Sequence, residues 1–214
     1  MQERLRAAFA RWGLPRCLRV DNGKPWGSWS DLPPALALWL IGLGITVVWN
    51  DPCRPQQNGV VERSQGTAKR WAEPQACPTA AHLQARLDAD DVLQRERYPV
   101  ARGRSRWELF PGLAHSGRRY RAAGEARAWS LGRVADHLAE YALPRRVDCQ
   151  GKVSVYNRNV YVGVVHKGQQ VWVQFDSEQR HWLISDSAGQ QLRSVPAPEI
   201  SAASIRSLRL AGRK

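Results

Sequence analysis

The sequence contains few cysteines and acidic residues, and no long apolar segment. Its four cysteines, Cys17, Cys53, Cys77 and Cys149, lie far apart and form no CxxC pair, so we expect neither a disulfide framework nor a zinc site. The longest uncharged stretch, 32–50, is interrupted by prolines and glycines, which argues against a membrane-spanning helix. These absences favour a cytoplasmic protein with reduced thiols and no membrane partner.

Several catalytic signatures are also missing. The five histidines show no HxxxH spacing and no cysteine partner at ligand spacing, so the usual ligand pattern of a zinc module is absent. The sequence has no glycine-rich phosphate loop and no serine nucleophile elbow. Nucleotide-triphosphate hydrolysis and serine-type acyl transfer are therefore not expected.

Positive charge and tryptophan are abundant. The 214 residues include 32 Lys and Arg against 19 Asp and Glu, which gives a net charge of +13, and ten tryptophans. A hydrophobic fraction of 43% predicts packed structure rather than a disordered basic tail. The excess charge is spread over the whole chain and predicts a polyanionic partner, most commonly a phosphate backbone. Arginine richness caused by a GC-rich genome is the alternative.

The N-terminal part alternates between helical and strand patterns. Apolar spacing predicts a helix over 1–12, a buried strand at 17–20, a helix from about 33 to 44, a strand at 45–49 and a helix over 58–71. This order is typical of parallel strands joined by crossover helices. The sequence therefore predicts an α/β fold.

The pattern changes in the C-terminal part. Helices are expected over 79–97 and 129–141, on either side of an arginine-rich segment. After Pro144, short β-branched segments alternate with turn clusters. Four or five such strands in about fifty residues predict a small barrel of SH3 type.

Two carboxylates occupy positions suited to metal chemistry. Asp21 ends the first strand, and Glu62 lies at the start of the third helix. Mg²⁺ is commonly bound by carboxylates together with substrate phosphate oxygens. Two such ions about 3.5–4 Å apart activate an attacking hydroxyl and stabilise the leaving oxygen of a phosphodiester. Spacing alone leaves an ordinary Asp-Asn-Gly turn and a solvated glutamate open as alternatives.

Four motifs, taken in this order, carry a resemblance to a known family. They are Trp12-Gly13-Leu14-Pro15, Val20-Asp21-Asn22-Gly23, Leu43-Gly44-Ile45 and Pro55-Gln56-Gln57-Asn58-Gly59-Val60-Val61-Glu62-Arg63. The combination resembles the integrase core of DDE-type transposases and retroviral-like integrases, most of all the transposases of bacterial insertion sequences. The resemblance runs from about Met1 to Tyr120, and the segment after Pro144 is similar to the C-terminal DNA-binding domains of these enzymes.

The resemblance implies a domain organisation. It places a partial RNase H-like integrase core at 1–75 and a helical, arginine-rich extension at 76–143. A small SH3-like β-barrel that binds DNA is expected at 144–196, followed by a flexible tail at 197–214.

It also implies Mg²⁺-dependent polynucleotidyl transfer in DNA integration, with Mn²⁺ as a substitute ion. In the family, Asp21 and Glu62 correspond to the second and third members of a metal-binding Asp-Asp-Glu triad. The first aspartate lies on an upstream strand, whereas Glu3 is the only acidic residue before Asp21 here. Asp31 and Asp51 are possible substitutes, although a helix cap and a turn explain them more simply.

The missing aspartate leads us to expect a truncated, decayed or split transposase with little or no activity of its own. A non-catalytic DNA-binding remnant is the alternative, and an RNA-binding basic protein is a third possibility. The implied partners are double-stranded DNA (transposon ends and target) and either further copies of the chain or a complementing N-terminal fragment. The expected location is the bacterial cytoplasm, in association with the nucleoid.

Further residues receive roles beside the two carboxylates. The resemblance implies that Asn58 and Gly59 set the geometry of the loop before the helix and that Arg63 and Lys69 lie near phosphate. Basic clusters interleaved with aromatic residues are suited to tracking a DNA backbone, with a solvated surface run as the alternative. The members expected to contact DNA are Arg104, Arg106, Arg118 and Arg119.

Overall fold

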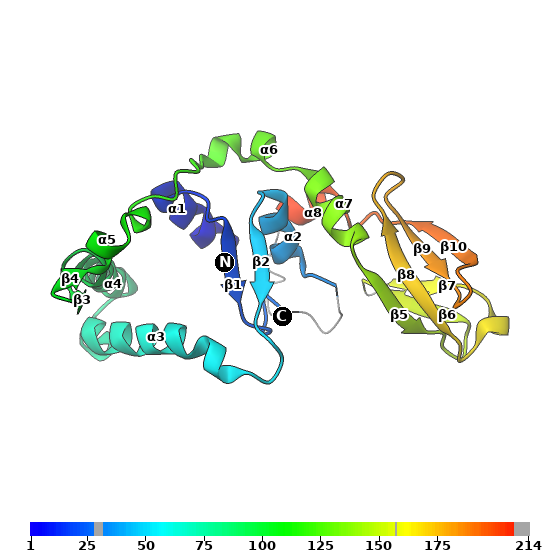
Figure 1. The fold of residues 1–214 in the computed structure, drawn as a ribbon, viewed down its shortest axis with the longest axis horizontal. Coiled ribbons are helices and arrows are strands. Elements are labelled where there is room, and N and C mark those ends of the chain that lie inside the picture. The colour runs from blue at the N-terminus through cyan, green and yellow to red at the C-terminus, as the bar shows by residue number, and fades with distance from the viewer. Residues whose placement is uncertain (28–31, 157, 208–214) are drawn as a thin grey trace. The chain divides into compact units, whose positions relative to one another are not determined.

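The computed structural model describes residues 1–27, 32–156 and 158–207. Its α-helices are α1 (Gln2–Trp12), α2 (Ala35–Gly42), α3 (Gly59–Ala72), α4 (Ala80–Val92), α5 (Arg106–Leu109), α6 (Glu125–Ala128), α7 (Leu131–Ala139) and α8 (Ala202–Arg206). Its strands are β1 (Cys17–Val20), β2 (Thr46–Trp49), β3 (Pro99–Ala101), β4 (Arg104–Ser105), β5 (Ala142–Arg146), β6 (Lys152–Val155), β7 (Arg158–Tyr161), β8 (Gln170–Asp176), β9 (His181–Ser185) and β10 (Gln191–Pro196). Figure 1 shows their arrangement along the chain.

Short helical segments complete the chain. A 3₁₀ turn, η1 (Pro55–Asn58), leads directly into α3, and a π-helical segment, η3 (Leu93–Arg97), continues α4. Further 3₁₀ turns are η2 (Pro74–Ala76), η4 (Pro111–Leu113), η5 (Ala122–Gly124) and η6 (Val164–His166).

The N-terminal elements follow the order that the periodicity predicts, and the mixed α/β character is confirmed. Strands β1 and β2 form a two-stranded sheet. The amide of Asn50, directly after β2, donates a 3.0 Å hydrogen bond to the carbonyl of Val20, the last residue of β1. Both strands therefore end at the same edge, as strands running in one direction do.

Helix α2 is buried on all sides. Every residue from Leu36 to Gly42 is buried, and Trp39 has no exposed surface. Because a helix that is apolar all round can be stable in water only when it is covered, the sequence predicts this burial, and the structure confirms it.

The chain divides into two compact units. The first unit comprises Glu3–Asp21 and Trp49–Ala122, and the second comprises Asn22–Val48 and the chain from Ala123 onward. The two units differ greatly in the number of apolar side chains that they bury. In the described part of the first unit, the buried apolar residues are Phe9, Leu14, Val20, Ala72 and Tyr120. Helix α3 buries only Ala72, and α4 has no buried residue.

The second unit has a dense aromatic and aliphatic core. Trp182 and Phe175 meet edge to face with ring centroids 4.9 Å apart, and both are buried. The indole of Trp39 donates to Glu125 Oε1 at 3.2 Å, and the indole of Trp129 donates to the carbonyl of Trp39 at 3.1 Å. These two bonds satisfy the buried indole donors, which would otherwise destabilise the core.

The strands predicted after Pro144 are present, but among the described residues they do not close into a barrel. Strands β10, β9, β8 and β5 form one antiparallel sheet in that order, and β6 and β7 form a separate hairpin. Strand β5 contains Pro144, which has no amide hydrogen to donate and is typical of a sheet edge. The neighbouring residue, Arg145, links β5 to β6 through its side chain, since its Nε donates to the Ser154 carbonyl at 3.3 Å.

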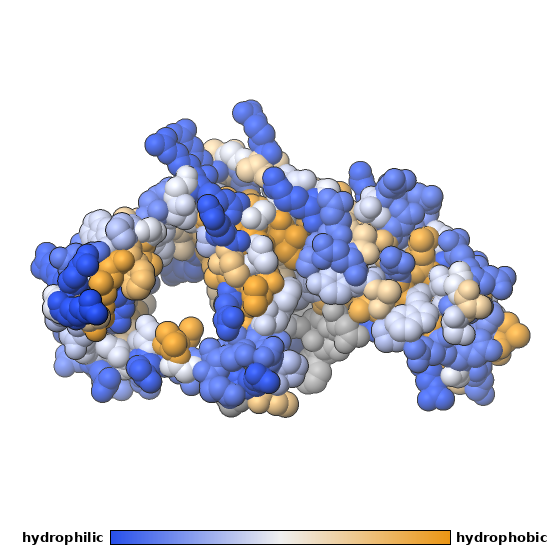
Figure 2. All heavy atoms as spheres, viewed as in Figure 1, coloured by the Kyte–Doolittle hydropathy of each residue, from blue (hydrophilic) through white to orange (hydrophobic). Residues whose placement is uncertain are grey.

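Hydrophilic side chains cover most of the face seen in Figure 2. Among the described residues, the helices are all too short or too polar to cross a membrane.

Candidate functional site

The two candidate metal ligands lie in the first unit and remain available to a ligand. Asp21 follows the last residue of β1, and Glu62 lies in the first turn of α3. Both side chains are exposed, and within the described residues neither forms an ion pair or a side-chain hydrogen bond. No contact joins the two carboxylates to each other.

A hydrogen-bonded joint connects the end of the sheet to the start of α3. Asn50 is buried, its amide bonds to Val20, and its side chain donates to Asn58 Oδ1 at 2.5 Å. Val20 precedes Asp21, and Asn58 precedes the helix that carries Glu62. Asn50 therefore contacts the residue before Asp21 and the residue before α3. The sequence singled out Asn58, but it gave no role to Asn50 beyond ending a strand.

A second pair of bonds closes the loop inside this joint. The Asp51 amide donates to Gln57 Oε1 at 2.9 Å, and Gln57 Nε2 donates to Asp51 Oδ2 at 3.0 Å. Arg54 lies 3.5 Å from the same carboxylate. The Asp51 carboxylate is thus engaged in a turn, whereas Asp31, the other expected substitute, lies outside the described residues.

Gly59 has no conformational reason to be glycine. Its φ of −56° is helical, and a Cβ added there would meet no atom within 4 Å. The joint is held by Asn50, Asn58, Asp51 and Gln57, and it does not depend on a glycine at 59.

The residues present match Mg²⁺ in donor type but not in number. Among the described residues, no group of three or more His, Cys, Asp and Glu side chains gathers in one place. Asp21 and Glu62 are exposed oxygen donors of the kind that Mg²⁺ prefers, and this ion commonly completes its shell with water and phosphate oxygens. Asp21 and Glu62 therefore match Mg²⁺ in ligand type only, and the described residues add no third acidic, histidine or cysteine ligand to them.

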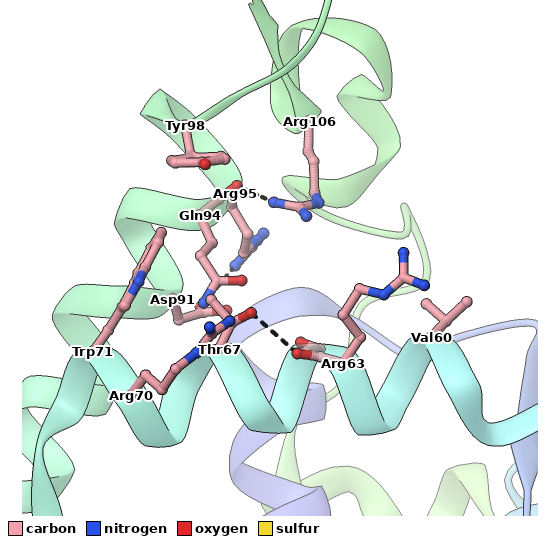
Figure 3. Close-up of a pocket in the computed structure, with 11 residues that line it drawn as sticks. Val60, Arg63, Thr67, Arg70, Trp71, Asp91, Gln94, Arg95, Tyr98 and Arg106 are labelled. Carbon is pink, nitrogen blue, oxygen red and sulfur yellow. Dashed lines mark hydrogen bonds and ion pairs between the residues drawn. The ribbon is translucent and has the colours of Figure 1, made fainter.

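An arginine-lined cavity of about 650 Å³ lies beside α3 in the same unit. Its walls come from one face of α3, from the end of α4 with η3, and from the start of α5 (Figure 3). Arg63 extends from α3, Arg106 enters from the opposite side, and the rings of Trp71 and Tyr98 lie toward one end. We call this the arginine cavity; its basic members are Arg63, Arg70, Arg95 and Arg106.

Arg106 is positioned by a capping box at the start of α5. The Glu108 amide donates to Ser105 Oγ at 3.3 Å, and the Ser105 amide donates to Glu108 Oε2 at 2.6 Å. The bond from the Ser105 amide holds the pKa of Glu108 below its usual value. Because Arg106 is the first residue of the capped helix, its guanidinium starts from a fixed backbone and donates to the Gln94 carbonyl at 2.7 Å.

The predicted DNA-binding residues divide between the arginine cavity and positions outside it. Arg63 and Arg106 line the arginine cavity, whereas Lys69, Arg104, Arg118 and Arg119 do not. Arg104 donates to the Glu108 carbonyl at 2.6 Å, and Arg118 donates to the Pro15 carbonyl at 2.7 Å. These two guanidinium groups therefore support local structure.

Two cavity residues, Arg70 and Trp71, have no role in the sequence-based hypothesis. Arg70 follows Arg63 by about two helical turns, so both lie on one face of α3. That spacing is visible in the sequence, but it indicates a cavity only once α4 and η3 are known to form the opposite wall.

The C-terminal sheet offers a smaller basic site. Arg145 and Arg146 line a cavity of about 320 Å³ with Pro144, Gly168 and Gln170. Arg146 Nε donates to the Gly168 carbonyl at 3.1 Å, which leaves its terminal nitrogens available.

No protein-family model matches this chain, so a functional assignment has to start from the motifs and the geometry described above.

Proposed function

We propose that this chain acts in DNA recombination, as a transposase or integrase whose first unit is a partial RNase H-like core. The observation that carries the proposal is the joint around Asn50. It ties the end of the strand before Asp21 to the start of the helix that carries Glu62, and both carboxylates remain exposed and unpaired among the described residues. Carboxylates placed after a strand and on a nearby helix are suited to an ion bound at a sheet edge.

In this proposal Asp21 and Glu62 hold Mg²⁺, or Mn²⁺ in its place, beside a phosphodiester. The ion supplies Lewis acidity and an acidified water or hydroxyl nucleophile. Arg63, one residue after Glu62, offers a bidentate cation to a phosphate oxygen. The C-terminal sheet, a relative of SH3-like DNA-binding domains in this proposal, binds the transposon end or target duplex. Such a protein works in the bacterial cytoplasm at the nucleoid.

The proposal includes a protein partner, either further copies of the chain or a fragment that supplies the first aspartate. Exposed apolar side chains in the first unit support it: Val60 is 82% exposed, and Phe110 is 62% exposed. An apolar groove of about 410 Å³ also lies beside β1, with Leu5, Phe9, Trp12, Leu18 and Leu113 among its lining residues. Apolar surface of this kind is typical of interaction sites.

A strand-transfer assay with Mg²⁺ or Mn²⁺ and candidate end sequences tests the enzyme hypothesis. We expect Asp21→Asn and Glu62→Gln each to lower strand transfer by more than about 100-fold, since losing a metal ligand costs more than losing its supporting residue. Asp51→Asn is the matched control, because its carboxylate belongs to the turn. Equal loss in all three variants would contradict a metal site at Asp21 and Glu62.

The second candidate is a non-catalytic DNA-binding remnant of a transposase. The lack of a cluster of three metal-ligating side chains among the described residues favours it. It predicts salt-sensitive binding of duplex DNA without cleavage under any divalent ion. Cleavage that depends on Asp21 would exclude it.

A further inference from the structure

The arginine cavity combines free cations with aromatic rings, and these two features together suggest what it binds. Its charge is strongly one-sided, since four arginines face a single acidic residue, Asp91. All of its walls belong to the first unit, so its shape is set within that unit.

The four arginines are not equivalent. Arg95 lies 3.4 Å from Asp91, donates to the Leu113 carbonyl and stacks 5.0 Å from the Trp12 ring, so it supports the wall. The side chains of Arg63 and Arg70 have no hydrogen-bond or ion-pair partner among the described residues. Arg106 gives one nitrogen to the Gln94 carbonyl and keeps its other donors. Three guanidinium groups are therefore available to anions.

The free arginines are spread along the cavity rather than gathered at one point. Arg63 and Arg70 start from backbone positions about 10 Å apart, given the rise of an α-helix. Their side chains extend from separate turns of α3 (Figure 3), so the two guanidinium groups can contact different phosphates of one strand. The spacing favours a ligand with several phosphates in a row.

The aromatic end of the cavity can accept a planar group. Trp71 and Tyr98 have ring centroids 5.4 Å apart with planes inclined by 58°, and Tyr98 is 46% exposed. An exposed tyrosine beside a cationic groove is the pattern with which proteins stack unpaired bases. The bases of a duplex have no free faces except at its ends, so duplex DNA cannot use this end of the cavity.

We propose that the arginine cavity binds a single-stranded segment of DNA, with phosphates on Arg63, Arg70 and Arg106 and an unpaired base on Tyr98. This inference rests on the proposed function and specifies the form of DNA that the first unit takes. A strand freed from its duplex at a cleaved or frayed end has the required chemistry.

Fluorescence anisotropy on the full chain tests the proposal, with labelled oligo(dT) compared with a duplex of equal length. We expect Tyr98→Ala to weaken oligo(dT) binding by about 5- to 100-fold and to leave duplex binding unchanged, because stacking serves unpaired bases only. Tyr98→Phe should bind oligo(dT) like the original chain. The double variant Arg63→Gln/Arg70→Gln should lose oligo(dT) binding in excess of its loss of duplex binding.

Arg127→Gln is the matched charge control, because Arg127 is exposed on α6 and does not line the cavity. The proposal would be overturned if Tyr98→Ala bound oligo(dT) as tightly as the original chain. It would also be overturned if the arginine variant lost equal affinity for oligo(dT) and duplex DNA. In either case, continued duplex binding by the original chain would leave the proposed function standing. Displacement by dTMP at equal concentration would indicate a free-nucleotide site, and tighter binding of oligo(U) would indicate RNA. Failure to bind any form of DNA would remove the proposed function as well.

Discussion

Gly42 lies where the indole of Trp129 crosses α2. A Cβ at this position would approach Trp129 Nε1 to 2.1 Å, and both residues lie in the covered interior of the second unit. We expect Gly42→Ala to lower the free energy of unfolding by about 1–3 kcal/mol, since overpacked cores must shift side chains or backbone. Calorimetry would show this as a lower Tm.

Gly66→Ala is the matched control for that substitution. Gly66 is exposed in the middle of α3, and a Cβ there would meet open space. Alanine should raise the stability of the helix by about 0.5–1 kcal/mol, because glycine loses more backbone entropy on folding. A stability change of the same sign in both variants would contradict the packing shown around Gly42.

His137 makes the second unit sensitive to mild acid. Burial lowers the pKa of His137, more than the nearby Glu140 carboxylate raises it. The unfolded chain therefore binds more protons than the folded one between the lowered pKa and about 6.5, the ordinary value. The folded state therefore keeps its full stability above about pH 6.5, where His137 is neutral in both states. It loses stability as the pH falls from there through the lowered pKa of His137. Thermal unfolding measured from neutral to mildly acidic pH should show a steeper fall in Tm for the original chain than for His137→Gln.

At the scale of elements, the start of α3 depends on the joint around Asn50. Asn58→Ala removes the acceptor of the 2.5 Å bond from the buried Asn50. We expect a loss of about 1–3 kcal/mol in the local free energy of opening, the usual cost of a buried polar group without its partner. Hydrogen exchange should accelerate in the first turn of α3. Gly59→Ala should leave that exchange unchanged or slow it, and acceleration in both variants would show that the side-chain bond is not what holds the joint.

The elements predicted well are those whose pattern is local. The apolar sequence of α2 specifies its burial. The capping box of α5 is equally local, in the spacing from Ser105 to Glu108, but it is not among the features predicted from the sequence. The β3–β4 hairpin escapes the periodicity because its turn, Arg102 and Gly103 at φ of 50° and 72°, joins strands of only two or three residues. A period of two cannot be recognised in segments this short.

The features that the sequence could not give depend on partners far along the chain. Trp39 and Glu125 are 86 positions apart, and neither residue type indicates the other. The arginine cavity likewise needs α4 and η3 opposite α3. The strand pattern after Pro144 predicts strands, but their division into a sheet and a hairpin is decided by which edges pair.

On the scale of the whole molecule, the net charge of +13 should dominate binding to DNA under the proposed function. If six or more phosphates are neutralised, duplex affinity should fall by about 10³-fold or more between roughly 50 and 200 mM salt, because counterions are released on binding. Anisotropy titrations over that range measure the slope. An affinity that hardly changes with salt would contradict a phosphate-backbone partner.

The thin interior of the first unit has a kinetic consequence. Helices α3 and α4 bury very little hydrocarbon, and we expect segments of this kind to open far more often than a dense core does. Glu62 and the free arginines therefore lie in a part of the chain that we expect to open locally at a small cost in free energy. A nucleic acid strand or protein that binds both α3 and α4 would stabilise their closed arrangement, and part of its binding free energy would offset the cost of ordering them. Amide hydrogen exchange in α3 and α4 should therefore slow when it binds.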